Sequence, residues 1–218
     1  NVLTHKFFNI TPTLSANQDY YTTIRAHDLA GNQSSDVTSA AWQLPTPGGV
    51  SSGLVLWLDA DDAGTLYTDN TCSTPATLDG DVIGCWQDKS TSTNHATATG
   101  GARPTLQLNE FNNQSILRFD GTNDALDFTS INTIRTLFVV NKSSATTFQQ
   151  ILGHSTSRNF YTNNATLLDG TISSANLRTG SWREDRTVVS SPTTFTQSGS
   201  YSLLSVVAVS YTHLTLPT

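Results

Sequence analysis

Short runs of alternating hydrophobic and polar residues follow one another along the chain, with turn-forming residues between them. At positions 20–26 the residues Tyr20, Thr22, Ile24 and Ala26 alternate with their neighbours, which is typical of a strand with one buried face. Residues 54–58 (Leu-Val-Leu-Trp-Leu) are apolar without a break, as in a strand buried on both faces. No stretch has a helical period. Further strands are predicted at 82–86, 105–108, 115–119, 136–141, 149–153 and 200–208.

Turn signals separate these predicted strands. Asx and Gly residues tolerate the positive φ that tight hairpins need. Short strands at regular spacing with such turns indicate an all-β, antiparallel sandwich or jelly roll. The signals are Asp79-Gly80-Asp81, Gly100-Gly101, Asn112-Asn113, Asp120-Gly121 and Asp169-Gly170.

Composition supports the all-β prediction and argues against nucleic acid and membrane as partners. The 218-residue chain has 35 Thr, 25 Ser and 16 Asn but only three Lys and two Glu, so good helix formers are scarce. Its net charge of −6 argues against a nucleic-acid surface, which needs clustered cations. The apolar run at 203–209 is far short of the roughly 20 residues that cross a bilayer, so we expect no membrane span.

Both ends of the sequence have the features of a piece of a longer protein. The chain contains no Met and begins with Asn1. Residues 209–218 (Val-Ser-Tyr-Thr-His-Leu-Thr-Leu-Pro-Thr) back-translate into a transposon-end adapter used in sequencing libraries, so we interpret them as a cloning or sequencing scar. The alternative is an edge strand at 205–216.

The first 44 residues carry a spacing found in β-sandwiches. Leu14 and Tyr20 are separated as in a tyrosine corner, and Arg-Ala-His-Asp-Leu-Ala-Gly-Asn follows at 25–32. Residues 1–44 therefore resemble the end of a bacterial fibronectin type III domain, which implies strands at 7–10, 20–26 and 37–44. Residues 45–52 are rich in Pro, Gly and Ser, which is typical of a linker.

Four segments downstream of the linker have a recognisable order and spacing. They are 54–62 (Leu-Val-Leu-Trp-Leu-Asp-Ala-Asp-Asp), 86–90 (Trp-Gln-Asp-Lys-Ser) with 94–96 (Asn-His-Ala), 102–104 (Ala-Arg-Pro), and 117–121 (Leu-Arg-Phe-Asp-Gly) with Asp124 and Leu126. In this order they resemble bacterial laminin G-like domains. The resemblance implies a concanavalin A-like, antiparallel jelly-roll sandwich over 53–208, truncated at its C-terminus. At Thr91-Ser92-Thr93 the family usually has glycine, so we expect an altered turn there.

The sequence lacks the residue patterns of hydrolytic catalysis. Glycosidases need two carboxylates at the scissile bond, and glucanase relatives of this fold carry Glu-x-Asp-x-x-Glu. Glu110 and Glu184 lie in no such motif. Residues 153–157 lack the Gly-x-Ser-x-Gly elbow, and the histidines lack zinc spacing. We therefore expect no enzyme activity.

Two acidic clusters offer the oxygen ligands that calcium prefers, although neither has EF-hand spacing. The alternative is that Asp120-Gly121 makes a hairpin turn and Asp59 caps a strand end, with no ion bound. The candidate ligands are Asp59, Asp61 and Asp62 in the first cluster and Asp120, Asn123 and Asp124 in the second.

Cys72 and Cys85 enclose a short loop rich in Thr, Asp and Gly. A disulfide between them would contribute about 3 kcal/mol on the chain-entropy model and would indicate an exported protein. The alternative is two free thiols. We favour the disulfide.

Aromatic side chains are the candidate carbohydrate contacts, because a ring face suits the apolar face of a pyranose. Trp57 and Phe119 lie in apolar runs and are predicted to be core residues. Trp182, followed by Arg183, is flanked by polar residues, so we predict that its ring is exposed and contacts ligand together with Arg183.

The resemblance implies a non-catalytic binding module of a secreted or cell-surface bacterial protein. The expected ligand is a carbohydrate or another extracellular molecule, bound in adhesion. Two alternatives stay open: a structural spacer, and an accessory module of a glycan-degrading enzyme. Fold alone does not decide among them.

Overall fold

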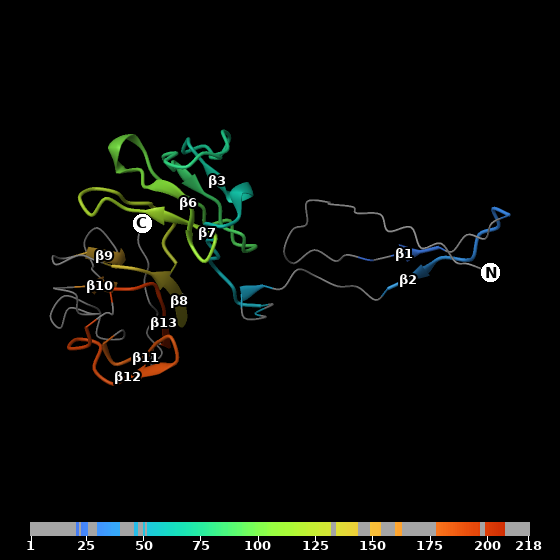
Figure 1. Cartoon of the computed structure of the whole chain (residues 1–218). Coiled ribbons are helices and arrows are strands. Elements are labelled where there is room, and N and C mark those ends of the chain that lie inside the picture. Colours follow the sequence, from blue (N-terminus) through green and yellow to red (C-terminus); the bar gives the residue numbers. More distant parts are fainter. Residues whose placement is uncertain are drawn as a thin grey trace. The chain divides into compact units, whose positions relative to one another are not determined.

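A computed structural model describes residues 21, 23–25, 30–39, 46–47, 50, 52–131, 134–143, 149–153, 160–162, 178–196 and 199–207. Every strand pair in these residues is antiparallel, and the named helical elements are the short 3-10 turns η2 (Ala63–Thr65) and η3 (Gly100–Ala102). The all-β, antiparallel prediction is therefore confirmed (Figure 1).

The chain divides into two units, Asn1–Leu54 and Val55–Thr218. In the first unit, β1 (Thr23–Ile24) pairs with β2 (Val37–Thr38), inside the strands predicted at 20–26 and 37–44. The predicted strand at 7–10, the Leu14–Tyr20 corner and the adapter-like residues 209–218 lie outside the described residues.

The earlier part of the second unit contains two small sheets. β3 (Leu66–Tyr67), β4 (Cys85–Trp86) and β5 (Ala96–Thr97) form one, in that order. β6 (Thr105–Phe111) and β7 (Gln114–Arg118) form a hairpin. Asn112 and Asn113 both have positive φ between its strands, as a two-residue turn of the predicted kind requires.

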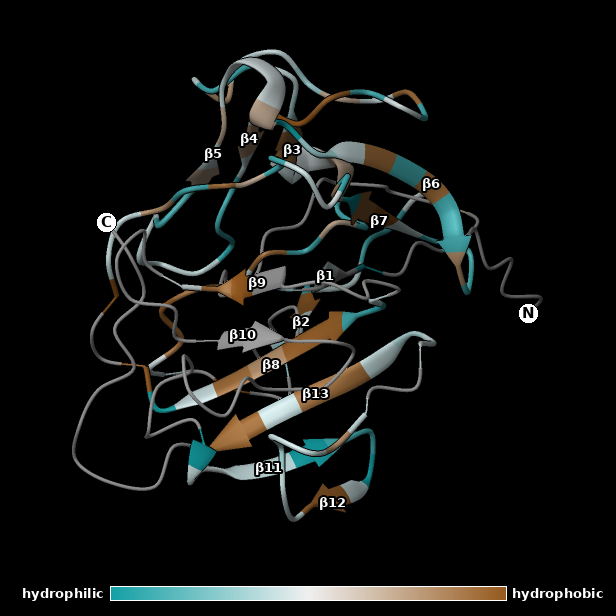
Figure 2. Ribbon diagram, turned by 90° about the vertical axis from the view of Figure 1, so that its left-hand side faces the viewer, coloured by the Kyte–Doolittle hydropathy of each residue, from teal (hydrophilic) through white to brown (hydrophobic). Residues whose placement is uncertain are grey.

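The later part of the second unit contains a four-stranded sheet in the order β12-β11-β13-β8. Figure 2 shows its strands side by side, with hydrophobic residues along β8 and β13. β9 (Gln149–Leu152) and β10 (Phe160–Thr162) pair separately. The strands of the larger sheet are β8 (Thr136–Asn141), β11 (Ser181–Glu184), β12 (Thr187–Val189) and β13 (Ser202–Val207).

Two hydrophobic clusters form the core of the second unit. The first contains Leu66, Ala76, Ile83 and Leu106, and the partly buried Trp86 and Leu117 pack against it. The second lies on one face of the four-stranded sheet and contains Ile131, Ile134, Trp182, Val189, Leu204 and Val206. Residues of β13 alternate between this buried face and the opposite, exposed face, as the period of a strand requires.

The prediction of a buried strand at 54–58 is wrong, because these half-buried residues form no strand. Their backbone groups bond to the segment 88–94 instead of to a neighbouring strand. The amide of Trp57 donates to Asp88 Oδ1 at 2.7 Å, and the carbonyl of Trp57 accepts from the Lys89 amide at 2.8 Å. Asn94 Nδ2 donates to the carbonyl of Val55 at 2.9 Å.

Candidate functional site

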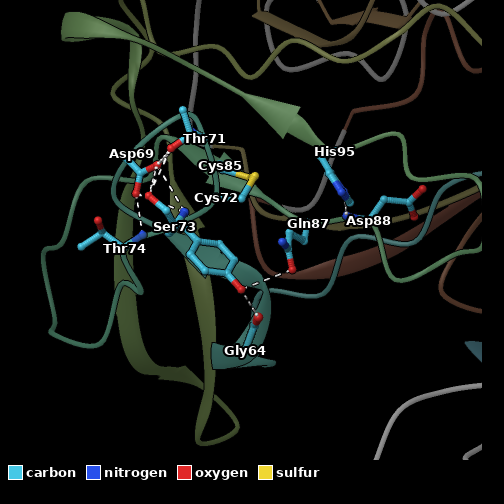
Figure 3. The surroundings of a disulfide bond; sticks show 11 residues. Gly64, Asp69, Thr71, Cys72, Ser73, Thr74, Cys85, Gln87, Asp88 and His95 are labelled. Atoms are coloured by element: carbon cyan, nitrogen blue, oxygen red, sulfur yellow. Dashed lines mark hydrogen bonds between the residues drawn. A yellow bond between two sulfur atoms is a disulfide. The ribbon is translucent and has the colours of Figure 1, made fainter.

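The loop between β3 and β4 is closed by a disulfide. Cys72 and Cys85 are bonded, with their Cα atoms 5.3 Å apart. Cys85 is fully buried in β4, whereas Cys72 is half-buried in the loop (Figure 3). Gly84 brings the strand close to the loop, because a Cβ there would lie 2.6 Å from the backbone carbon of Asp69. The loop is therefore held against β4 at two adjacent positions.

Asp69 organises the same loop from within (Figure 3). Its carboxylate accepts hydrogen bonds from the hydroxyl and amide of Thr71, from the hydroxyl and amide of Ser73, and from the amide of Thr74. These bonds favour the charged form, the Thr71 hydroxyl most of all, and hold the pKa of Asp69 well below its ordinary value. The carboxylate oxygens of Asp69 are therefore occupied by hydrogen bonds within the loop.

Asp88 connects the segment 86–96 to the segment 54–58. It is buried, and its carboxylate accepts from the amides of Trp57, Ser90 and Asn94 and from the Ser90 hydroxyl. Its own amide donates to Nδ1 of His95 at 3.0 Å (Figure 3). Each oxygen of Asp88 therefore has two donors, which compensates for the burial of its charge.

In the first predicted calcium cluster, Lys89 bridges two of the three carboxylates. Its ammonium lies 2.9 Å from Asp59 Oδ2 and 2.7 Å from Asp62 Oδ2, and it sits 4.4 Å above the Trp57 ring. Burial lowers the pKa of Lys89, but its bonds to Asp62 and Asp59 outweigh that effect, so the pKa is raised. Asp61 Oδ1 instead accepts from the Ser115 amide at 2.8 Å.

In the second predicted cluster, the carboxylates bind backbone amides. Asp120 Oδ1 accepts from the amides of Thr122, Asn123 and Asp124, which lower its pKa. Asp124 Oδ2 accepts from the Asp120 amide at 2.8 Å, and Asn123 Nδ2 donates to the carbonyl of Gly101 at 3.0 Å. Within the described residues no group of three or more His, Cys, Asp or Glu is placed to hold a metal ion. Calcium binding stays a prediction, which a melting-temperature comparison between millimolar calcium and chelator tests.

The prediction of an exposed Trp182 is wrong. Only 1% of Trp182 is exposed, and its ring lies in the hydrophobic cluster beneath the four-stranded sheet. Its polar neighbours in the sequence point the other way, because adjacent residues of β11 face opposite sides of the sheet. Arg183 is accordingly exposed on the outer face.

Arg183 shares the outer face of the sheet with several apolar side chains that the sequence did not identify. Phe138 and Val140 of β8 are each 64% exposed, and Val188 of β12 is 61% exposed. Leu203 and Val207 of β13 are also exposed. We call this set the outer sheet face. It consists of Phe138, Val140, Arg183, Val188, Leu203, Ser205 and Val207.

The two glutamates lie apart from any recognisable acid–base pair. Glu110 Oε1 accepts from Arg118 at 2.8 Å in the β6–β7 hairpin. Glu184 points into the buried side of β11 and accepts from the Ser202 hydroxyl at 3.0 Å. Each carboxylate therefore has a structural partner.

Comparison of the chain with protein-family models, with curated proteins and with solved structures gives no match. In the described part of the chain, no helix is long and apolar enough to cross a membrane.

Proposed function

We propose that this protein is a non-catalytic binding module of a secreted or cell-surface bacterial protein, and that a carbohydrate binds to its outer sheet face. The single observation that supports this is the exposure of Phe138 and Val140 beside Arg183. Contiguous exposed apolar residues next to polar groups are typical of binding surfaces. A phenyl ring offers the flat apolar face on which a pyranose can stack.

The proposal includes the two domain types that the sequence resembles. The antiparallel sheets of the second unit are compatible with a concanavalin A-like, laminin G-like jelly roll. The antiparallel β1–β2 pair is compatible with the end of a fibronectin type III domain. The disulfide supports an exported location, because such bonds persist in oxidising compartments.

A glycan array probed with the whole chain and with Phe138→Ser tests the proposal. We expect binding to at least one glycan class, and a loss of about tenfold in affinity when the stacking ring is removed. Leu78→Ser is the matched control, because Leu78 is 67% exposed but lies between β3 and β4, outside the outer sheet face. Wild-type protein that binds no glycan would instead support the structural spacer.

A further inference from the structure

The outer sheet face differs in charge from the rest of the protein. The chain carries a net charge of −6, yet Arg183 lies on this face, Arg186 lies in the β11–β12 turn and Lys142 directly follows β8. Glu184, next to Arg183 in β11, faces the buried side of the sheet, and Asp185 Oδ1 accepts from the Leu203 amide at 2.9 Å. Glu110, which acts electrostatically on Tyr201 just before β13, is paired with Arg118. An acidic protein therefore presents a cationic, apolar surface here.

Strand register places the aromatic and cationic groups in one row. Arg183 pairs with Ser205, and Ser205 pairs with Phe138 on the other side of β13. Neighbouring strands are about 4.8 Å apart, so the backbones at Arg183 and Phe138 are separated by roughly 10 Å. Val188 extends the row beyond Arg183.

From this row we infer that the ligand is an anionic carbohydrate, with one sugar on Phe138 and the carboxylate of a neighbouring uronate on Arg183. This inference rests on the proposed function. The planar guanidinium can donate two parallel hydrogen bonds to a carboxylate, which a neutral sugar cannot accept in the same way. Within the described part of the chain, the Arg183 side chain makes one hydrogen bond, a long one of 3.5 Å from Nη1 to the carbonyl of Arg186.

Charge also disfavours a second copy of the chain as the occupant. Two outer sheet faces in symmetric contact would place Arg183 of both copies in one interface. Like charges at an interface oppose association. An uronate-bearing glycan has the complementary charge and still offers apolar sugar faces to Phe138 and Val140.

Calorimetric titration of the whole chain tests the inference. The probes are a short oligogalacturonate and its methyl ester, which differ in charge but share the sugar backbone. We expect the acid form to bind at least tenfold more tightly at low salt, because charged hydrogen bonds contribute more than neutral ones. Arg183→Gln should remove this difference, whereas Arg118→Gln, in the exposed Glu110 pair, should preserve it.

Several outcomes would overturn the inference. Equal affinity for acid and ester, or an equal loss for both in Arg183→Gln, would exclude charge selection but leave a neutral carbohydrate ligand in place. Equal binding of an oligoglutamate of the same charge would show that any polyanion suffices. Binding to neither probe, with Phe138-dependent binding to neutral glycans on the array, would overturn only this inference. Binding to no glycan at all would overturn the proposed function as well.

Discussion

Thr93 adopts a φ of +54°, a region that β-branched residues rarely occupy. Its neighbour Asn94 fixes this conformation, because the Asn94 amide donates to buried Asp88 and its side chain donates to the carbonyl of Val55. The strain coincides with the segment where the resembled family usually has glycine.

We therefore predict that Thr93→Gly stabilises the protein by about 1 kcal/mol, since glycine adopts positive φ without steric cost. Urea denaturation measures the change. Thr91→Gly is the control, because Thr91 lies in the same loop outside the positive-φ region and gains only chain entropy in the unfolded state. A loss of stability in both variants would contradict the prediction.

The hydrogen bonds of Asp69 lead to a second prediction at the residue scale, on how the stability of the protein changes at acidic pH. Its folded pKa lies below the ordinary value of 3.8, so its stabilisation is complete above that pH and is lost as the pH falls toward the folded pKa. Asp69→Asn should lower the melting temperature at neutral pH. The difference from wild type should shrink progressively below about pH 4.

A pH series of melting temperatures checks the effect of Asp69. Asp127→Asn serves as the control, because Asp127 is exposed and its backbone rather than its carboxylate pairs with Thr97. The interpretation fails if the two variants respond to pH in the same way, or if Asp69→Asn is neutral at pH 7.

At the scale of elements, the contact between β4 and the loop that it closes depends on Gly84. A Cβ at this position would lie 2.6–2.9 Å from backbone atoms of Asp69, Thr68 and Asn70, which cannot move as a flexible side chain would. Gly84→Ala should therefore destabilise the protein by about 1–3 kcal/mol. Urea denaturation provides the measurement.

Gly101 offers a matched substitution for Gly84→Ala. A Cβ at Gly101 would have Asn123 Nδ2 as its nearest neighbour, at an ordinary contact distance of 3.7 Å. Gly101→Ala should change stability by less than about 0.5 kcal/mol. Equal effects of the two substitutions would mean that the loop does not pack on Gly84.

The disulfide is the second constraint on this loop, and its removal makes a separate prediction. The bond joins residues 13 apart in the sequence, so the double variant Cys72→Ala, Cys85→Ala should lose about 3 kcal/mol. Intact mass before and after reduction, without variants, should differ by about two daltons if the bond is formed. No mass gain, or an unchanged urea midpoint in the double variant, would contradict the prediction.

Elements with strong local signals were predictable from the sequence. The strand at 136–141 has the predicted bounds, and the β6–β7 hairpin forms around the Asn112-Asn113 turn. The lack of a strand at 54–58 was not predictable, because hydrophobicity alone cannot show that buried Asp88 accepts the hydrogen bond of the Trp57 amide. The strand β11 was not predicted either. Its residues alternate between exposed and buried, but Ser, Arg and Glu around Trp182 give no alternation of hydrophobic and polar residues in the sequence.

Local sequence also limits which residues of the candidate site could be predicted. Arg183 is exposed, but Trp182 beside it faces the core. Phe138 and Val140 belong to an uninterrupted apolar run, which is the usual pattern of a strand covered on both faces. Their exposure depends on what the rest of the fold leaves uncovered, and local sequence does not contain that information.

At the scale of the whole molecule, the second unit contains two separate hydrophobic clusters. One lies among β3, β4 and β6, and the other lies under the four-stranded sheet. Phe111, at the end of β6, stacks on Tyr201, immediately before β13, with ring centroids 4.3 Å apart. The Lys142 ammonium lies 5.1 Å from the centroid of the Tyr201 ring. These rings provide a direct link between the two halves.

Tyr201→Ser should therefore weaken both halves together rather than the four-stranded sheet alone. Loss of an aromatic pair costs about 0.5–1.5 kcal/mol beyond the buried area, and Tyr201→Phe should retain most of that contribution because it keeps the ring. Hydrogen exchange measured by mass spectrometry reports each half separately. If the ring contact couples the stability of the two clusters, the amides of β4 and β6 should exchange faster in Tyr201→Ser than in the wild type. The increase should be by the same factor as for the amides of β11 and β13. Faster exchange confined to β11 and β13 would instead show that the two clusters unfold independently and that the ring contact does not couple them.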